Sequence, residues 1–434
     1  MSQKLIRGTT AAAIAASAES AIDTGALAAG ARMPTIRELA ASLRVSPVTV
    51  TAAYRLLRAR GLLVSDGRRG TRVRQHPPTS TAHTALRRVD ADLVDLANGN
   101  PDPTLLPPLG TALHRLDPDS PLYGTSPQLA SLMTFAAADF AADGINADAL
   151  TVTGGALDAV ERILGEFVRP GDRVAVEDPT LPGLLELLRV TGAVPEPVEI
   201  DADGVLPGAL DRALRRRVRA LVVTPRAQNP TGAAMSPGRA HDIKRLLRAH
   251  RDVLVIENDA AGPVAGVPAV TLCDPPPSHW AVVRSTSAFL GPDLRLALVA
   301  GDTLTIARVR ARQALGTRWV SRLLQQLALA LWSDPSSGRT LARASEVYAA
   351  RRTALVDALT ERGIPSSGRS GFNVWVPVVE ETATVQSLAR CGWAVAPGER
   401  FRIASPPGIR ITTSALVPDD ARRLAADLAA VVRG

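Results

Sequence analysis

Several residues of this sequence could bind an anion. The segment Thr153-Gly154-Gly155-Ala156 precedes a helical pattern, so its backbone amides would lie at the positive end of a helix dipole, a common place for a phosphate. Guanidinium groups hold carboxylates and phosphates through paired hydrogen bonds, so an arginine such as Arg295 or Arg410, and a hydroxyl such as that of Ser285, could complete an anion site if the fold places it nearby. These residues predict recognition of a small anion; the alternative is a structural role, with Arg295 paired to a carboxylate.

Positive charge is concentrated near the N-terminus. Residues 30–75 contain ten arginines against Glu38 and Asp66, which gives +8, and the formal net charge of the whole 434-residue chain is also +8. The remaining residues therefore balance to zero. Charge confined to one short segment is typical of proteins that bind a polyanion such as DNA, whereas a solvated arginine-rich surface is the alternative.

Two helix starts lie within this basic segment. Thr35 followed three residues later by Glu38 is a capping box, and Ser46 before Pro47 supplies an N-cap and a first-turn proline for a second helix. Two helices joined by a tight turn form a helix-turn-helix, whose second helix can enter the major groove of DNA. The second-helix side chains that point away from its apolar face are Thr49, Thr51 and Arg55.

Residues 62–74 predict a β-hairpin after these helices. Gly67 and Gly70 permit a tight loop, and Arg68, Arg69 and Arg72 could contact phosphates. A hairpin in this position would be the wing of a winged helix.

The elements that must position the anion-binding residues follow a linker rich in Pro, Ser and Thr at 75–83. Short apolar runs then alternate with helical stretches, which predicts an α/β domain with a mostly parallel sheet. A smaller α/β subdomain is expected from about residue 344. The expected strands are 173–177, 219–224, 253–257, 281–284 and 294–300, and the expected helices are 156–167, 181–189, 237–248 and 304–314.

Composition narrows the class of protein. The two cysteines, Cys273 and Cys391, have no metal-binding spacing and are expected to be buried free thiols in a reducing compartment. The apolar stretch 11–16 is far too short to span a membrane, and no secretory signal pattern occurs. We therefore expect a cytoplasmic protein without a membrane partner and without a metal site.

Residues 27–73 resemble the GntR-type winged helix along nearly their whole length. They contain the opening G-x-x-M-P-T-x-R-E-L-A, the recognition-helix start S-x-x-T-V, and an altered wing motif ending in Gly70-Thr71-Arg72-Val73. The resemblance places Arg37, Thr49, Thr51 and Gly70 near DNA, although Pro47 stands where many relatives have an arginine. The candidate DNA-binding residues are Thr35, Arg37, Ser46, Thr49, Thr51, Arg55, Arg68, Arg69, Gly70 and Arg72.

Four segments of the α/β region resemble, in order, class I aminotransferases of the pyridoxal-phosphate fold. They are Thr153-Gly154-Gly155-Ala156, Asn229-Pro230-Thr231-Gly232, the segment 284–295, and Gly408-Ile409-Arg410-Ile411. The resemblance implies that Asn229 contacts the ring oxygen of the cofactor, Ser285 and Arg295 its phosphate, and Arg410 a substrate carboxylate. The candidate ligand-binding residues are Gly155, Ala156, Asn229, Asn258, Ser285, Ser287, Ala288, Arg295 and Arg410.

A GntR-type winged helix followed by such a domain is the architecture of the MocR regulators, which this chain resembles over almost its whole length. The predicted fold is a small α+β winged helix-turn-helix followed by an α/β fold-type I aminotransferase-like domain with a small C-terminal α/β subdomain. The predicted boundaries are 1–75 for the DNA-binding domain, 76–92 for the linker and 93–434 for the aminotransferase-like domain, of which about 344–434 form the subdomain.

The chain departs from the aminotransferase pattern at three positions. Ala288 stands where the family has the lysine that bonds the cofactor, and the chain has only Lys4 and Lys244 as other lysines. Asn258 replaces the aspartate that faces the ring nitrogen, while Asp259 would point to the opposite face of its strand. No Phe, Tyr or Trp occurs between Phe167 and Trp280 to stack on the ring.

The sequence therefore predicts a transcriptional regulator rather than an enzyme. Its expected partners are a double-stranded DNA operator, a second copy of the chain in a homodimer, and a small anionic effector. No covalent cofactor is expected, and pyridoxal phosphate is expected to bind only non-covalently if it binds. Two alternatives remain: a regulator that binds pyridoxal phosphate non-covalently as a sensor, and a lysine-to-alanine variant of a pyridoxal-phosphate-dependent protein.

Overall fold

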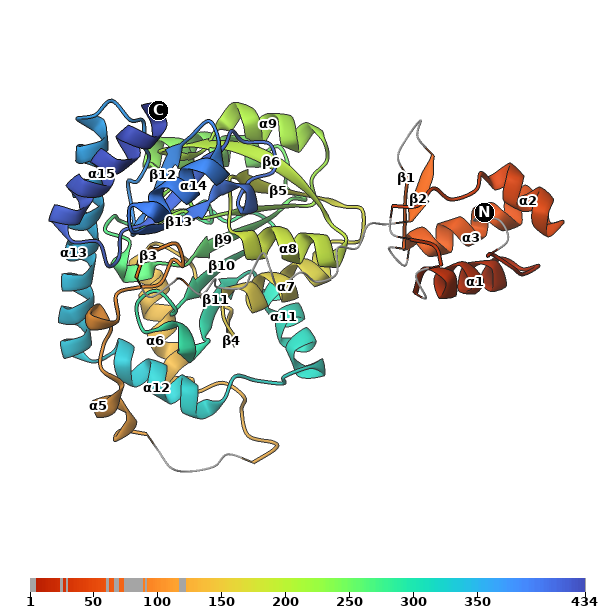
Figure 1. The fold of residues 1–434 in the computed structure, drawn as a ribbon. Helices are drawn as coiled ribbons and strands as arrows, with labels where there is room; N and C mark the ends of the chain where they lie inside the picture. Colours follow the sequence, from red (N-terminus) through yellow and green to blue (C-terminus); the bar gives the residue numbers. More distant parts are fainter. Residues whose placement is uncertain are drawn as a thin grey trace. The chain divides into compact units, whose positions relative to one another are not determined.

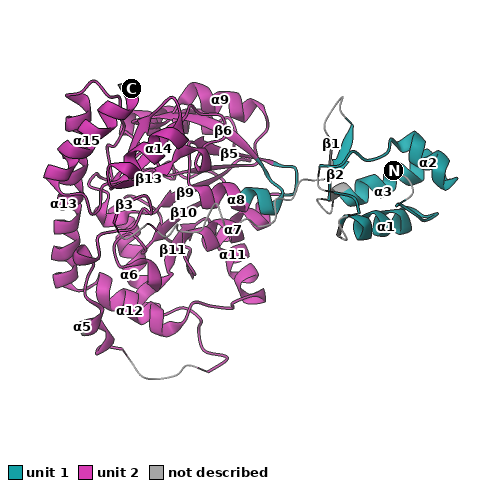
Figure 2. Ribbon diagram, viewed as in Figure 1, with its two compact units in different colours: residues 1–82, 169–172, 188–194 teal, residues 83–168, 173–187, 195–434 magenta. Residues whose placement is uncertain are grey.

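The computed structural model describes residues 5–23, 26–28, 30–59, 62–65, 70–73, 89, 92–116 and 122–433. They belong to two compact units (Figure 2). One unit comprises residues 1–82 with 169–172 and 188–194, and the other comprises the rest of the chain. In the described part of the chain, no helix is long and apolar enough to cross a membrane.

The N-terminal unit contains the predicted winged helix-turn-helix (Figure 1). Its two strands are antiparallel, with Ser65 opposite Thr71. Both halves of the predicted capping box are present: the Thr35 hydroxyl accepts from the amide of Glu38, and the Glu38 carboxylate accepts from the amide of Thr35. The elements are α1 (Ala11–Asp23), α2 (Ile36–Leu43), α3 (Pro47–Ala59), β1 (Leu63–Ser65) and β2 (Thr71–Val73).

Packing of the three helices explains this unit's stability. Leu39, Val50 and Leu57 are fully buried at helical spacing, so each helix turns one apolar stripe inward. The buried hydroxyl of Tyr54 donates to the carbonyl of Pro34, which ties α3 to the start of α2. The orientation of the recognition helix is therefore fixed by buried contacts.

A mostly parallel sheet forms the centre of the large unit, as the alternating pattern predicts. In the described residues it has eight strands, in the order β4-β11-β10-β9-β8-β5-β6-β7. Strands β5, β8, β9 and β10 pair in parallel, whereas β11 is antiparallel to β4 and β10. The strands are β4 (Leu150–Thr153), β5 (Arg173–Asp178), β6 (Val194–Asp201), β7 (Gly204–Val205), β8 (Ala220–Val223), β9 (Leu254–Asp259), β10 (Trp280–Ser285) and β11 (Ala297–Gly301).

Helices cover this sheet (Figure 1), as a parallel sheet requires. Helices α7 and α11 contact one another and the same strands β4, β10 and β11, so they lie on one face. The helices are α5 (Leu109–Leu113), α6 (Ala130–Ala142), α7 (Ala156–Phe167), α8 (Pro182–Thr191), α9 (Pro207–Arg215), α10 (Pro237–Leu247), α11 (Thr303–Leu315), α12 (Arg322–Trp332) and α13 (Pro335–Thr360). Short 3-10 turns are η3 (Pro103–Leu105), η4 (Gly262–Val264) and η5 (Pro292–Leu294).

A second sheet builds the small subdomain, with strand order β12-β14-β13-β3. Its strand β3 comes from the start of the domain and pairs in parallel with β13, so the subdomain also uses residues outside the predicted range 344–434. No sequence pattern indicated this pairing, because β3 is only three residues long. The elements are β3 (Val94–Leu96), β12 (Asn373–Pro377), α14 (Glu381–Arg390), β13 (Trp393–Pro397), η6 (Gly398–Arg400), β14 (Gly408–Thr412) and α15 (Pro418–Arg433).

Two local expectations were wrong. The strand predicted at 294–300 begins only at Ala297, because η5 precedes it and Arg295 has a left-handed backbone with φ 44°. Cys273 is buried as expected, but Cys391 is exposed because it follows the end of α14 in the turn to β13.

Candidate functional site

The recognition surface of the winged helix is formed by the start of α3. Ser46 caps this helix by accepting from the amide of Thr49 at 3.2 Å, and the two hydroxyls lie 2.8 Å apart. The Thr51 hydroxyl donates to the carbonyl of Pro47. Arg55 and, on α2, Arg37 are exposed. These hydroxyls are partly engaged within the helix, so the free polar contacts come mainly from the two arginines.

An apolar residue completes this surface, and the sequence analysis missed it. Val48 is 76% exposed at the second position of α3. An exposed methyl group on a recognition helix can contact the thymine methyl in the major groove. No pattern could have identified Val48, because its exposure depends on how α2 and α3 pack.

The wing is described only at its base. Gly70 has φ 91°, which a residue with a side chain rarely adopts, and it lies beside the Arg32 guanidinium. Arg72 is half-buried and donates to the carbonyl of Gly30, so part of its guanidinium supports the hairpin. The predicted phosphate contacts Arg68 and Arg69 lie outside the described residues.

A pocket of about 180 Å³ lies at the carboxyl ends of the parallel strands, the usual ligand site of such sheets. It brings Asn229 together with Ser285, Ser287 and Ala288, which lie much further along the sequence. The Ser285 hydroxyl is buried and donates to that of Ser287. The full lining is Gly99, Asn100, Pro101, Ala227, Asn229, Ala260, Ala261, Ser285, Ser287, Ala288, Pro292, Phe372 and Asn373.

Arg410 lies beside this pocket and is buried without an acidic partner. Its Nη1 donates to Asn229 Oδ1 at 3.1 Å and its Nη2 to the carbonyl of Ala97, while its Nε has no partner among the described residues. Burial, with a smaller effect of the nearby Arg400, lowers the pKa of Arg410 to about 10. A buried guanidinium without a carboxylate is costly, so the site favours an anionic ligand.

Arg295 and Gly155 lie together at the start of α7. Strand β11 pairs with β4, which brings Arg295 to the start of α7, and a Cβ on Gly155 would approach the Arg295 guanidinium to 3.0 Å. Arg295 is exposed, and no described carboxylate pairs with it. Asp158 in the first turn of α7 already accepts from the amide of Gly154, so one amide of this helix start is satisfied; Ala156 begins the helix.

Asn258 and Asp259 face opposite sides of β9, as predicted. Asp259 is buried away from the pocket and pairs with Arg226 and Arg284. Burial alone would raise the pKa of Asp259, but Arg226 and Arg284 outweigh it and lower the pKa. Asn258 Oδ1 is buried and has no hydrogen-bond partner among the described residues. Asn258 does not line the pocket, but its orphaned acceptor is suited to a hydrogen-bond donor on a ligand.

Other pocket residues could not be found from the sequence. Gly99 and Asn100 follow β3, and a Cβ on Gly99 would approach the Arg410 guanidinium to 3.2 Å. Phe372 and Asn373 come from the small subdomain. They reach the pocket only because this subdomain closes over the sheet edge, which no local pattern indicates. Among the described residues, no group of His, Cys, Asp and Glu could hold a metal ion.

The chain matches two known families along different parts of its length. Residues 91–428 match the family described as aminotransferase class I and II, and residues 10–73 match the bacterial regulatory proteins of the gntR family. The vitamin B6 salvage pathway transcriptional repressor PtsJ of Salmonella typhimurium (strain LT2) is 40% identical over 428 residues, which cover 98% of this chain and 99% of that protein.

Further similarities agree with both matches. The HTH-type transcriptional regulator TauR of Rhodobacter capsulatus is 27% identical and covers 87% of this chain, at 86% of its own length. The solved structure of Pyrococcus horikoshii kynurenine aminotransferase has a TM-score of 0.72 at 22% identity, over 79% of this chain and 91% of that one. At that identity the structural similarity shows the fold alone.

Proposed function

The chain belongs to the MocR-type regulators, in which a GntR-family winged helix precedes an aminotransferase class I and II domain, and we propose that it represses transcription in response to a vitamin B6 phosphate bound without a covalent link. The relatives PtsJ and TauR, which match most of the chain, are transcriptional regulators. The name of the Salmonella repressor refers to vitamin B6 salvage.

The observation that carries the proposal is the side chain of Ala288. It lines the pocket at the position that the family resemblance assigns to the cofactor-bonding lysine, and a methyl group cannot bond a carbonyl carbon. Lys244 does not line the pocket; its ammonium donates to the carbonyl of Asp274 beyond the end of α10. Lys4 lies outside the described residues. Binding without a covalent bond and without transamination follows from this set of side chains.

The residues present fit the parts of pyridoxal phosphate. Arg295, with the amides at Gly155 and the hydroxyls of Ser285 and Ser287, would hold the phosphate. Asn229 turns its Oδ1 toward Arg410, which leaves its NH2 group to donate to the ring oxygen. Bound in an aminotransferase, the cofactor supplies an electron sink.

The ring nitrogen would meet the orphaned Oδ1 of Asn258, which can accept a hydrogen bond but carries no charge. A neutral amide stabilises a protonated ring much less than a carboxylate does. Asn258 in place of the aspartate therefore favours a protein that binds the cofactor without using it for catalysis. The absence of a lysine at Ala288 supports the same conclusion.

Arg410 supports a ligand with a second anionic group. Its burial without an acidic partner makes the free pocket unfavourable electrostatically, and a bound carboxylate would relieve this. An amino-acid conjugate of the vitamin would present both a phosphate and a carboxylate. Regulation then requires that such a ligand have different affinities for the conformation that binds DNA and the conformation that does not.

We also propose that the chain acts as a homodimer. Strongly exposed large apolar side chains in the described part of the large unit include Leu122 at 80%, Tyr123 at 81%, Leu315 at 90% and Val379 at 93%. Such residues are common in subunit interfaces. Two copies would present two recognition helices, as paired operator half-sites require.

The proposed function is tested by DNA binding with and without the vitamin. Fluorescence anisotropy would measure the dissociation constant of the full chain for a duplex carrying its own promoter region, at fixed salt, with increasing pyridoxal 5′-phosphate. We expect tight binding that shifts at least fivefold when the ligand is saturating. A dissociation constant independent of the ligand would contradict the sensor role, and absence of binding would contradict the regulator role.

A further inference from the structure

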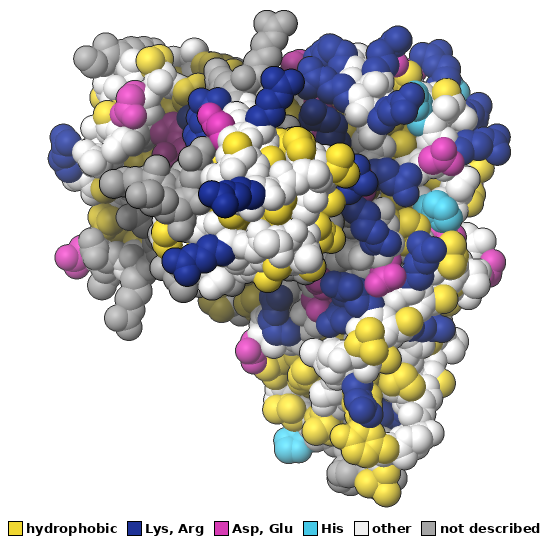
Figure 3. Space-filling model, turned by 90° about the vertical axis from the view of Figure 1, so that its right-hand side faces the viewer, with side chains coloured by type: hydrophobic (Ala, Val, Ile, Leu, Met, Phe, Trp, Pro, Cys, Tyr) yellow, Lys and Arg dark blue, Asp and Glu magenta, His cyan; other side chains and the backbone are white. Residues whose placement is uncertain are grey.

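The large unit carries a strongly basic surface at the edge of its sheet opposite the pocket. Residues 207–251 contain eleven Lys and Arg residues against Asp211 and Asp242, a formal +9, and the other residues of 76–434 carry −9. Within the segment Arg226 is buried, and Arg212, Arg216 and Arg239 pair with carboxylates outside it, so the surface charge comes from the remaining cations. Figure 3 shows Lys and Arg side chains gathered on one part of the surface. Segregation of charge to this extent favours a polyanionic partner.

The fold sets three of these cations close together. Arg219 directly precedes β8, and Arg251 lies three residues before β9, the neighbouring parallel strand. The carbonyl of Arg219 accepts from the amide of Leu254, which fixes the two strand starts side by side. Arg248 follows α10, and its guanidinium reaches the same region. All three side chains are exposed.

Neighbouring arginines are used differently. Arg173 and Arg216 both pair with the buried carboxylate of Glu196, at 2.8 Å and 2.7 Å, so they serve the structure. Arg219, Arg248 and Arg251 form no ion pair with a described carboxylate, although Asp252 follows Arg251 in the sequence. A helix dipole accounts for a cation at the end of α10 but not for Arg219 and Arg251, which lie outside helices.

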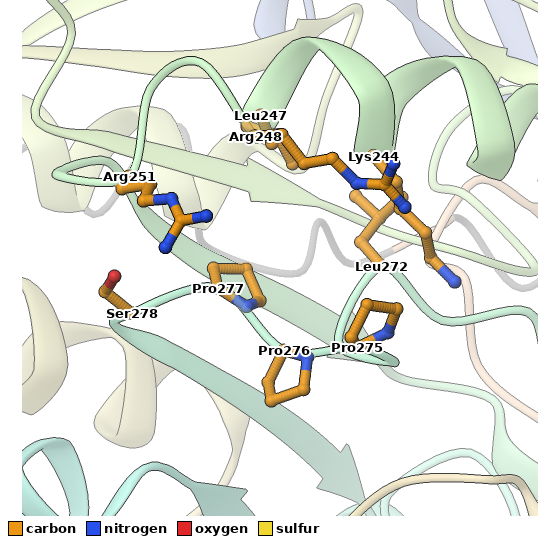
Figure 4. A pocket seen from close by; sticks show the side chains of 9 residues that line it. All are labelled: Lys244, Leu247, Arg248, Arg251, Leu272, Pro275, Pro276, Pro277 and Ser278. Atoms are coloured by element: carbon orange, nitrogen blue, oxygen red, sulfur yellow. The ribbon is translucent and has the colours of Figure 1, made fainter.

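A hollow of about 230 Å³ lies within this surface. Figure 4 shows Lys244 and Arg248 on one side of it, the prolines 275–277 on the opposite side, and Arg251 at one end. The prolines have no amide hydrogen to donate, so the hydrogen-bond donors among the lining side chains are the Ser278 hydroxyl and the cations Lys244, Arg248 and Arg251. Arg219 and Arg251 precede neighbouring strands, which lie about 4.8 Å apart. The cations are therefore spread along the ends of the strands and do not close around a single pocket.

We propose that this surface, defined by Lys244, Arg219, Arg248 and Arg251, binds phosphates of duplex DNA in addition to the contacts of the winged helix. Phosphates recur about every 3.4 Å of helix axis along one DNA strand, a spacing that an exposed array at a sheet edge can follow. The inference rests on the DNA-binding function and adds a second contact surface in the aminotransferase-like domain. It predicts sequence-independent contacts that strengthen and orient operator binding.

The test compares three forms of the full chain on one 40-base-pair duplex. The test variant is Arg219→Gln/Arg248→Gln/Arg251→Gln. The matched control is Arg339→Gln/Arg343→Gln/Arg390→Gln, which removes three exposed arginines of α13 and α14. Dissociation constants are measured by anisotropy over a range of KCl concentrations. Each lost phosphate contact lowers the slope of log K against log salt by about 0.9, so we expect the test variant to lose about 2 to 3 and the control nothing.

Each outcome decides a different statement. A slope for the test variant equal to that of the control would overturn the inference while leaving the winged helix as the DNA-binding element. If the parent chain does not bind the duplex, the DNA-binding function itself fails, and the inference fails with it. Calorimetry with inorganic phosphate distinguishes DNA from a small anion as the occupant of this surface. If the test variant loses phosphate binding but keeps the salt slope of DNA binding, the surface binds a small anion and our proposal is contradicted.

Discussion

Substitution by methionine should affect the stability of the free protein very differently at two buried arginines of the large unit. Arg284 lies among three carboxylates, with Asp139, Asp143 and Asp259 all within ion-pair distance. Burial alone would lower the pKa of Arg284, but Asp259 and Asp139 outweigh it and raise the pKa. Arg410 is equally buried and has no carboxylate partner. We predict that Arg284→Met destabilises the free protein strongly and that Arg410→Met does not.

The structure gives the magnitudes. The fall in the pKa of Arg410 to about 10, from the usual value of a guanidinium, corresponds to about 3 kcal/mol against the charged form. Arg410→Met removes this cost but leaves the carbonyl of Ala97 without its donor, which costs about 1–3 kcal/mol. The two effects nearly cancel, so the free energy of unfolding should change by less than about 2 kcal/mol. Arg284→Met leaves Asp139 without an ion-pair partner and leaves Asp143 and Asp259 with Arg226 alone, which should cost about 3–5 kcal/mol.

Thermal unfolding of the two variants and of the parent chain measures the difference. At about 2 °C per kcal/mol, Arg284→Met should lower the unfolding midpoint by roughly 6–10 °C, and Arg410→Met should leave it within roughly 4 °C. Arg422→Met, which removes an exposed arginine paired with Asp419, serves as the control and should have no effect.

Ligand affinity, unlike stability, should depend strongly on Arg410. The probe is N-(5′-phosphopyridoxyl)-L-leucine, which carries both a phosphate and a carboxylate and requires no lysine. Loss of one partner of a buried charge pair costs about 2–5 kcal/mol, so Arg410→Met should weaken the probe at least about 30-fold. If Arg410→Met instead destabilises the free protein as much as Arg284→Met, the guanidinium is structural and the reasoning is refuted.

Three further predictions follow from other residues. Ala288→Lys should form a covalent bond with pyridoxal 5′-phosphate that borohydride makes permanent, visible by intact mass; absence of this product, with the parent also unmodified, would show that Ala288 is not at the lysine position. Arg68→Gln/Arg69→Gln should lower the salt slope of DNA binding by about 2, whereas an unchanged slope would place the wing elsewhere. Burial raises the pKa of Glu257 to about 7, so its stabilising neutral form is present below about pH 4.5 and is lost as pH rises through about 7. Glu257→Gln should therefore reduce the fall of the unfolding midpoint between about pH 4.5 and 7; a parallel fall in both proteins would mean that Glu257 does not titrate there.

The sequence predicted the elements with strong local signals. The capping box at Thr35, the alternation of strands and helices, and the opposite orientations of Asn258 and Asp259 all depend on short-range geometry, and the structure has each of them. The family resemblance supplied what local patterns cannot, namely that Asn229, Ser285 and Ala288 would meet in one pocket.

Other features depended on tertiary packing. The pairing of β3 with β13 joins strands about 300 residues apart in the chain, and the contribution of Phe372 and Asn373 to the pocket depends on the same closure. The exposure of Val48 and the clustering of Arg219 with Arg251 likewise appear only when neighbouring elements are in place. Charge counts along the sequence located the basic segment at 30–75 but missed the equally basic segment at 207–251, because acidic residues elsewhere in the large unit cancel it.

The most direct test of the account is a calorimetric titration of the full chain with pyridoxal 5′-phosphate, in the absence and presence of saturating DNA. We predict one reversible binding event per chain, released by gel filtration, with an affinity that DNA changes by the same factor by which the ligand changes DNA affinity. Absence of binding, or an affinity unchanged by DNA, would contradict the claim that this pocket is a non-covalent sensor coupled to the winged helix.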